Sequence, residues 1–332
     1  MAHPITFPGG KRFAFTICDD TDMSRVETVA PVYRLLEDLG LKAAKSVWPL
    51  PNRGEKTIYD VSHTLADPEY STFIADLKRR GFEITFHGAG MSSSSRDDVI
   101  GALARYAAVV GEMPRIHTNH AQNRDNLYWG VDRVDDPVVK WVLRRDGLPG
   151  DHYQGHVAGS RYYWGDLCQE HVSYVRNLTF DRPNVLSINP SMPYHDPSRP
   201  QVRYWFSASE ADDVEEFNQL LAADRLAALE REGGVCIVAT HLGKKFAVDG
   251  QVNPVTKELL TRLASRPGWF PNLSELLDFL RLERRGGDQM GAGEWRAMQW
   301  RYLRDAYRQK QGQKRRHAER RRRAQAPAAR PS

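Results

Sequence analysis

Hydrophobic and polar positions follow two alternating periods along the first half of the chain. Apolar segments at 12–18, 41–48, 82–87 and 115–120 have the composition of strands. Between them, apolar residues recur at spacings of three and four, which predicts helices over about 24–40, 67–81, 95–111 and 136–147. A regular alternation of strands and helices indicates parallel strands joined by helical crossovers.

The second half is less regular. Residues 148–210 are rich in aromatic side chains, with short strand candidates near 184–188 and 202–208. A long helix over 211–230, a strong strand over 234–240, and helices near 254–264 and 273–284 are predicted to follow. About six or seven strands without an intervening linker favour one closed or nearly closed parallel barrel over two domains. We expect this barrel to span 1–285, and 286–332 to form a helical, polybasic and partly disordered C-terminal extension.

The basic charge is concentrated at the C-terminus. The 332 residues carry a net charge of +5, but 312–332 alone hold eight Lys or Arg and one Glu, so the remaining residues sum to −2. This excludes a nucleic-acid-binding domain over the whole surface, and leaves the tail as a possible tether to nucleic acid or an anionic membrane.

Membrane and secretory features are not expected from the sequence. The longest apolar runs have five residues, whereas a membrane-spanning helix needs about 20. The N-terminus lacks the pattern of a secretory signal, and the three widely spaced cysteines indicate neither a disulfide framework nor a zinc knuckle. We therefore expect a cytoplasmic protein, and leave its oligomeric state open.

Four predicted strands end in residues that bind metals or transfer protons. Asp19 and Asp20 follow the first strand, and His87, His120 and His241 each follow a later one. The carboxyl ends of parallel strands meet at one end of a barrel, where active sites gather. A catalytic metal site uses three Asp or His ligands and an open position, and the ion lowers the pKa of bound water toward about 7. With a carboxylate as general base and a histidine as general acid, such an array suits hydrolysis of an amide or ester.

At these residues the sequence resembles the polysaccharide deacetylase (chitooligosaccharide deacetylase-like) superfamily. Residues 13–22, FAFTICDDTD, resemble its first motif, 83–87 resemble the Glu-Ile-Gly-x-His of its second, and 239–241 resemble its last. The resemblance covers about residues 12–285 and implies a distorted parallel (β/α)7 barrel with a divalent metal, zinc being the expected ion. Carried over by position, it makes Asp19 the general base, Asp20 and His87 metal ligands, and His241 the general acid.

The sequence departs from this pattern at the third ligand. The family's second motif has another histidine four residues after the first, and here that position is Met91, whose thioether is a poor zinc ligand. We expect His120 to take this place, with Asp22 and His117 as alternatives. The arginine-proline motif of the family is absent as well, and Arg124 is the candidate for a related role in binding the substrate.

Aromatic segments suggest how a saccharide would be bound. Trp129 and Trp164 are candidates to stack on sugar rings, although aromatic residues are equally common core material. Asp166 is a candidate to orient a catalytic group. Together these features predict a metal-dependent hydrolase that removes an acyl group, with N-acetyl as the expected case, from a carbohydrate. The alternatives are a non-catalytic saccharide-binding or polysaccharide-assembly protein on the same fold, and the tail tether.

Overall fold

A parallel barrel forms the body of the protein. The computed structural model describes residues 5–51, 62–120, 123–147, 152–284 and 287–325. Its barrel strands are β1 (Phe13–Asp19), β2 (Ala43–Val47), β3 (Glu83–Phe86), β4 (Ile116–His117), β5 (Tyr174–Phe180), β6 (Tyr204–Glu210) and β7 (Val235–Thr240). They are adjacent in chain order, and β7 pairs in parallel with β1 from Ala14↔Val235 to Asp19↔Thr240, which closes the barrel. The predicted (β/α)7 barrel is thus confirmed.

The barrel is irregular in three places. The strand β4 has two residues, the β5–β6 register shifts between Arg176 and Thr179, and the short β10 (Gly268–Trp269) pairs with the start of β1. A small antiparallel hairpin, β8 (Ala247–Val248) and β9 (Gln251–Val252), lies outside the barrel.

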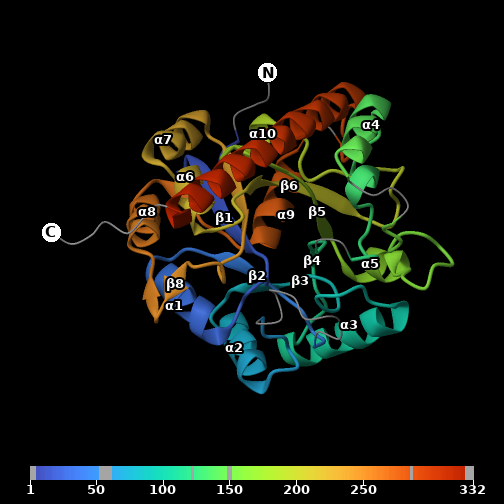
Figure 1. Ribbon diagram of the computed structural model, residues 1–332, viewed down its shortest axis with the longest axis horizontal. Coiled ribbons are helices and arrows are strands. Elements are labelled where there is room, and N and C mark those ends of the chain that lie inside the picture. The colour runs from blue at the N-terminus through green and yellow to red at the C-terminus, as the bar shows by residue number, and fades with distance from the viewer. Residues whose placement is uncertain (1–4, 52–61, 121–122, 148–151, 285–286, 326–332) are drawn as a thin grey trace.

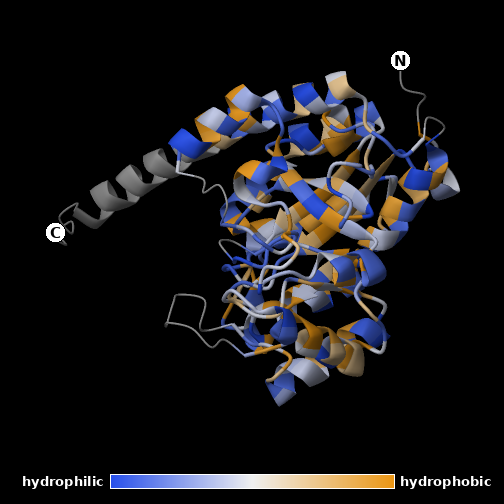
Figure 2. Cartoon of the chain, turned by 90° about the vertical axis from the view of Figure 1, so that its right-hand side faces the viewer, coloured by the Kyte–Doolittle hydropathy of each residue, from blue (hydrophilic) through white to orange (hydrophobic). Residues whose placement is uncertain are grey.

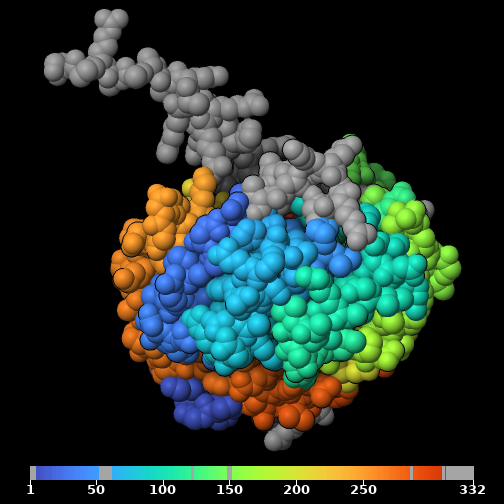
Figure 3. Space-filling view, turned by 90° about the horizontal axis from the view of Figure 1, so that it is seen from below, coloured from blue at the N-terminus to red at the C-terminus, as the bar shows by residue number. Residues whose placement is uncertain are grey.

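Helices surround the strands (Figure 1). They are α1 (Val26–Asp38), α2 (Pro68–Arg79), α3 (Arg96–Val110), α4 (Pro137–Arg145), α5 (Gly165–His171), α6 (Val214–Leu220), α7 (Ala223–Glu232), α8 (Pro254–Ala264), α9 (Leu273–Glu283) and α10 (Ala292–Gln325). On the face shown in Figure 3 the chain runs from blue through cyan to green in sequence order, as expected when successive strand–helix units follow one another around a barrel.

Side chains alternate between the barrel interior and the layer under the helices. In β1, Phe13, Phe15 and Ile17 belong to the larger core, which they share with the helices. Ala14 and Cys18 belong to a second cluster with inward residues of the other strands and the apolar side of α9. Because successive side chains of a strand point to opposite faces, this alternation decides how the acidic residues at the end of β1 are directed.

The helix α9 closes the amino-terminal end of the barrel, and Figure 1 shows it across the centre of the strands. The backbone N–H of Ser274 donates to Glu83 at the start of β3, and Asp278 receives hydrogen bonds from Arg115 and Tyr174, which lie at the starts of β4 and β5. The opposite end, where the strands finish, is therefore the one available for a site.

Three predicted elements differ from the structure. The strand expected near 184–188 is a 3₁₀ turn (Val185–Ser187), and the true fifth strand, β5, lies in the segment predicted to be irregular, as does α5. The strand β5 was missed because polar Arg176 and Asn177 interrupt its apolar pattern. Both are buried in the fold, where they bond to other buried polar groups. The long helix expected over 211–230 is two helices, α6 and α7, separated at Leu221–Ala222.

The last helix, α10, packs along the outside of the body (Figure 2). Met298 and Tyr302 are buried in the core, and Oε1 of Gln299 accepts the N–H groups of Asp135 and Asp136 at the start of α4. The first part of the predicted extension therefore packs on the barrel. The predicted boundary at 285–286 and residues 326–332 lie outside the described residues. Among the described helices, none combines the length and apolar character that a bilayer crossing requires.

Candidate active site

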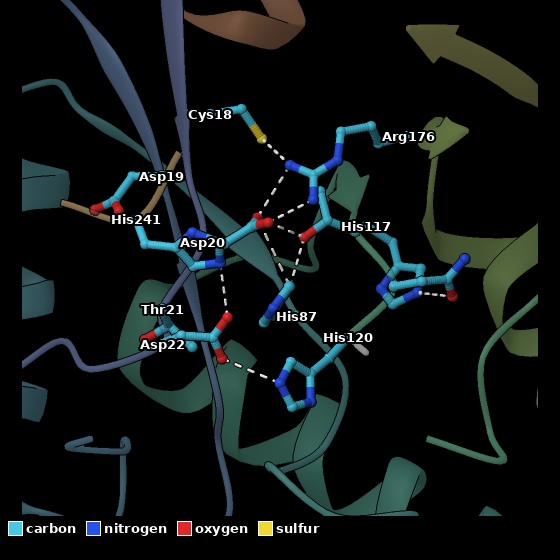
Figure 4. A network of polar contacts seen from close by, with 12 residues as sticks. Cys18, Asp19, Asp20, Thr21, Asp22, His87, His117, His120, Arg176 and His241 are labelled. Atoms are coloured by element: carbon cyan, nitrogen blue, oxygen red, sulfur yellow. Dashed lines mark hydrogen bonds and ion pairs between the residues drawn. The ribbon is translucent and has the colours of Figure 1, made fainter. Parts of the chain in front are cut away.

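The predicted site residues gather at the carboxyl end of the barrel (Figure 4). Asp20 and Asp22 follow β1, His87 follows β3, and His120 follows β4. All four side chains are buried. They come from three separate strand ends, and only the closed barrel brings them together.

One group of three residues has the spacing of a metal site. Asp22, His87 and His120 each offer one ligand atom, and these atoms lie within 4.8 Å of one another. Oδ1 of Asp22 is 3.0 Å from Nε2 of His120. Trp48 packs against both imidazoles, with ring centroids 5.9 Å from His87 and 4.9 Å from His120. The group contains two of the three expected ligands, with Asp22 in place of Asp20.

The hydrogen bonds of His87 fix its tautomer. The Thr118 hydroxyl donates to Oδ1 of Asp20 at 3.2 Å, so the hydroxyl oxygen accepts from Nδ1 of His87 at 2.6 Å. Nε2 therefore carries the lone pair, and it is buried without a hydrogen-bond partner among the described residues. Burial lowers the pKa of His87 to about 3, so the ring is neutral at neutral pH. An unpartnered, neutral imidazole nitrogen is the form that binds a metal ion.

Asp20 is engaged by an arginine from across the barrel. Arg176 of β5 donates to both carboxylate oxygens, with Nη1 3.1 Å from Oδ1. Burial by itself would raise the pKa of Asp20, but the charge of Arg176, together with that of His241, outweighs it and lowers the pKa to about 2. Asp20 is therefore ionised and held in place, and its oxygens are directed to Arg176 instead of the ligand group.

Asp19 lies on the other side of the strand. Its Oδ2 is 2.9 Å from Nζ of Lys45 on β2 and accepts the hydroxyl of Tyr33 on α1 at 3.0 Å, while Oδ1 accepts the N–H of Leu242 at 2.8 Å. Asp19 and Lys45 are completely buried. This position differs from the one expected of a general base. The alternation of β1 turns Asp19 outward under α1 and leaves Asp20 facing the barrel interior.

His241 is held between two carboxylates. Its Nε2 is 2.7 Å from Oδ2 of Asp22, and its Nδ1 is 3.1 Å from Oδ1 of Asp212. Burial would lower the pKa of His241, but hydrogen bonds to Asp212 and Asp22 dominate and raise it to about 10. The pKa of Asp22 is held well below its usual range, since its hydrogen bonds to His120 and His241 outweigh burial. At neutral pH, His241 is thus an imidazolium that can donate a proton.

Two asparagines close the loop that carries His120. The amide of Asn126 accepts from the N–H of His120 at 3.2 Å and donates to its carbonyl at 3.0 Å. In the same way, Asn119 bonds both the N–H and the carbonyl of Leu127. The alternative ligand His117 points elsewhere, toward the carbonyl of Phe86 and Oδ1 of Asn119, and it is not part of the ligand group.

The predicted substrate residues are more scattered. Trp164 is 1% exposed and its Nε1 donates to the carbonyl of Asp125, so it is a core residue with no face open to a sugar. Asp166 forms a two-point ion pair with Arg96 at the start of α3, and does not contact the acidic or histidine residues of the site. Trp129 is half-buried under the guanidinium of Arg133, whereas Arg124 is exposed.

Sequence reasoning missed three polar residues of this site. Arg176 was overlooked because its strand was not predicted. Asp212 follows β6, so the rule that strand ends carry functional groups would have found it. Asn126, which fixes His120, is near it in sequence but resembles an ordinary loop asparagine.

Comparisons with solved structures support the barrel fold of this chain. A structure assigned as a polysaccharide deacetylase from Mycobacterium smegmatis has a TM-score of 0.51 and 12% identity, over 87% of this chain and 97% of that one. An allantoinase has a TM-score of 0.48 and 11% identity, over 86% and 96% of the two chains. A structure assigned as a polysaccharide deacetylase from Pseudomonas aeruginosa PAO1 has a TM-score of 0.48 and 13% identity, over the same shares.

At 12% sequence identity, the likeness to the first of these structures shows the fold and does not identify the reaction. No protein-family model matches the chain, and no curated protein matches its sequence. The chain therefore has the barrel fold of polysaccharide deacetylases, on a strongly diverged sequence.

Proposed function

We propose that the protein is a metal-dependent hydrolase that removes an acyl group, with N-acetyl as the expected case, from a carbohydrate. The observation that carries the proposal is the unpartnered Nε2 of His87 beside Asp22 and His120. A buried polar atom without a partner costs free energy, and a bound cation would remove that cost. Asp22, His87 and His120 would hold the ion, zinc being the expected one.

A metal in this position would polarise the acyl carbonyl and lower the pKa of a water molecule. The residues around it supply the proton transfers. Asp20 is ionised and can accept a proton, and Arg176 holds it in a fixed orientation. His241 is protonated and can donate a proton to the departing amine. Compared with the sequence prediction, the general base is Asp20 instead of Asp19, and the carboxylate ligand is Asp22 instead of Asp20.

One observation favours the non-catalytic alternative. Arg176 binds both oxygens of Asp20 and helps to lower its pKa to about 2, which makes this carboxylate a weak base. A barrel that binds a metal and a saccharide without hydrolysis would have the same geometry. The experiment must therefore measure metal binding and turnover separately.

The test combines elemental analysis with acetate release from a panel of N-acetylated oligosaccharides, before and after treatment with a chelator. We expect His87→Ala and Asp22→Asn to lose both metal and turnover. Asp20→Asn should keep the metal and lose turnover. His195→Ala is a matched histidine control, since His195 lies near the start of β6 and bonds the carbonyl of Arg203.

Metal-free protein that still releases acetate would contradict the proposal. Metal-loaded protein that binds saccharides but hydrolyses none of them would support the non-catalytic alternative.

A further inference from the structure

Two arginines share one tyrosine ring, and one of them, Arg124, follows His120 by four residues. The guanidinium of Arg124 is 5.7 Å from the centroid of the Tyr162 ring, and that of Arg161 is 5.2 Å from the same centroid. Both arginines are exposed and Tyr162 is half-buried. Stacking on an aromatic ring orients a guanidinium while leaving its N–H donors available.

Among the described residues, these two arginines differ from the neighbouring Arg96, which has a carboxylate partner. Arg96 stacks on Tyr163 and is neutralised by Asp166, with N–O distances of 2.6 and 2.7 Å. Within the described part of the chain, no carboxylate forms an ion pair with Arg124 or Arg161. The pair thus presents two positive charges to solvent in a body whose net charge, without the tail, is slightly negative.

Hydrogen bonds fix this cluster relative to the loop of the proposed ligand His120. The N–H of Arg124 donates to the Ser93 hydroxyl at 3.0 Å, and its carbonyl accepts the N–H of Gln154 at 2.6 Å. The carbonyl of Arg161 accepts the N–H of Arg96 at 2.9 Å.

The same loop is tied to the loop of His87. The side chain of Asn123 donates to the carbonyl of Gly90 at 3.2 Å, and Asp125 accepts the N–H of Ser94 at 2.9 Å. The arginines are therefore carried by loops that are bonded to one another and to both histidine-bearing strand ends.

We propose that Arg124, Arg161 and Tyr162 form a subsite for an anionic group of the saccharide, a carboxylate or a phosphate. The proposal rests on the proposed function, because it specifies that the carbohydrate handled by this site is acidic. Guanidinium groups donate paired hydrogen bonds to carboxylate and phosphate oxygens. The proposal thus gives Arg124 a specific role in substrate binding, which is recognition of a negative charge on the saccharide.

Binding is measured by calorimetry on the full chain in the presence of chelator, so that hydrolysis plays no part. The probes are oligosaccharides of equal length: neutral N-acetylglucosamine units, galacturonic acid units, and a phosphorylated oligosaccharide. We expect the protein to prefer an anionic probe and the preference to weaken as salt is raised. The stronger of the two anionic probes identifies carboxylate or phosphate as the recognised group.

Arg124→Gln together with Arg161→Gln should weaken binding of that anionic probe about 10-fold and leave binding of the neutral probe unchanged. The matched control is Arg145→Gln, since Arg145 is an exposed arginine stacked on Trp141 of α4, at 5.6 Å. Equal binding of neutral and anionic probes, no binding of any probe, or an equal loss in the control would overturn the proposal.

Failure of the proposed function gives a different result. If the protein holds no metal and releases no acetate, but its preference for anionic probes depends on Arg124 and Arg161, the subsite is supported and the hydrolase proposal is contradicted. If the protein hydrolyses neutral and acidic sugars equally, the hydrolase proposal is supported and the subsite is contradicted.

Discussion

Nζ of Lys45 lies 2.9 Å from Oδ2 of Asp19, and both side chains are completely buried between the barrel and α1. The other oxygen of this carboxylate receives the N–H of Leu242, the residue that follows His241. The buried ion pair therefore connects the first strand to the loop that carries the proposed general acid.

Removal of Lys45 alone should be more damaging than removal of the whole pair. Lys45→Met leaves Asp19 as a buried charge without its partner, and we expect a loss of about 3–5 kcal/mol in the free energy of unfolding. Adding Asp19→Asn should recover much of this loss, because the asparagine still accepts the Leu242 N–H. Urea denaturation of the two variants checks this, and a double variant no more stable than the single one would contradict it.

The raised pKa of His241 predicts that the folded protein becomes less stable at alkaline pH. Its pKa is raised to about 10 in the folded protein, against about 6.5 in an unfolded chain. A raised histidine pKa stabilises the fold fully below about pH 6.5, and the contribution is lost as pH rises through about 10. Metal-free protein should thus lose stability from pH 7 to 10 relative to His241→Gln.

The partner of His241 gives a sharper form of this prediction. Asp212→Asn should lower the pKa of His241, as followed by NMR titration of its imidazole, and flatten the stability profile. The control is Asp213→Asn, since Asp213 caps α6 and does not bond His241. An imidazole that titrates near pH 6.5 in the unmodified protein would show that the two carboxylates do not act as described.

The loop asparagine Asn126 should control metal affinity without binding the metal. Asn126→Ala frees the backbone of His120, and we expect zinc affinity to fall about 10–100-fold, as for partners that orient metal ligands. Competition with a chromophoric chelator measures this. Asn184→Ala is a matched control, because Asn184 bonds the N–H of Val235 at the start of β7; a similar loss in that variant would point to a general effect on stability.

The sequence predicted the barrel and the end of it at which the candidate residues meet. Strand periodicity and the residues that follow each strand were sufficient for this, because parallel strands all finish at one end. The sequence analysis did not use the alternation along β1, in which apolar Phe13, Phe15 and Ile17 share a phase with Asp19, and it therefore placed Asp19 in the site. The role of Arg176 could not be predicted, because its strand has a poor apolar pattern and only the folded barrel shows that this arginine faces Asp20.

The first part of α10 stabilises the body of the protein. Deleting 292–332 removes the buried Met298 and Tyr302 and the bonds of Gln299 to α4, and should cost several kcal/mol of stability. Deleting only 312–332 keeps these contacts of Met298, Gln299 and Tyr302, so the melting temperature should fall by less. Thermal unfolding of the two truncated chains measures the difference, and equal melting temperatures would contradict this assignment.

The pairing of β1 with β7 has a consequence for biosynthesis. The first motif leaves the ribosome long before Val235–Thr240, which must lie beside it, and before Leu242, which bonds Asp19. Until those residues emerge, one edge of β1 and a buried carboxylate are without their native partners. A nascent or prematurely terminated chain therefore exposes the acidic motif, and the barrel can close only after β7 has been synthesised.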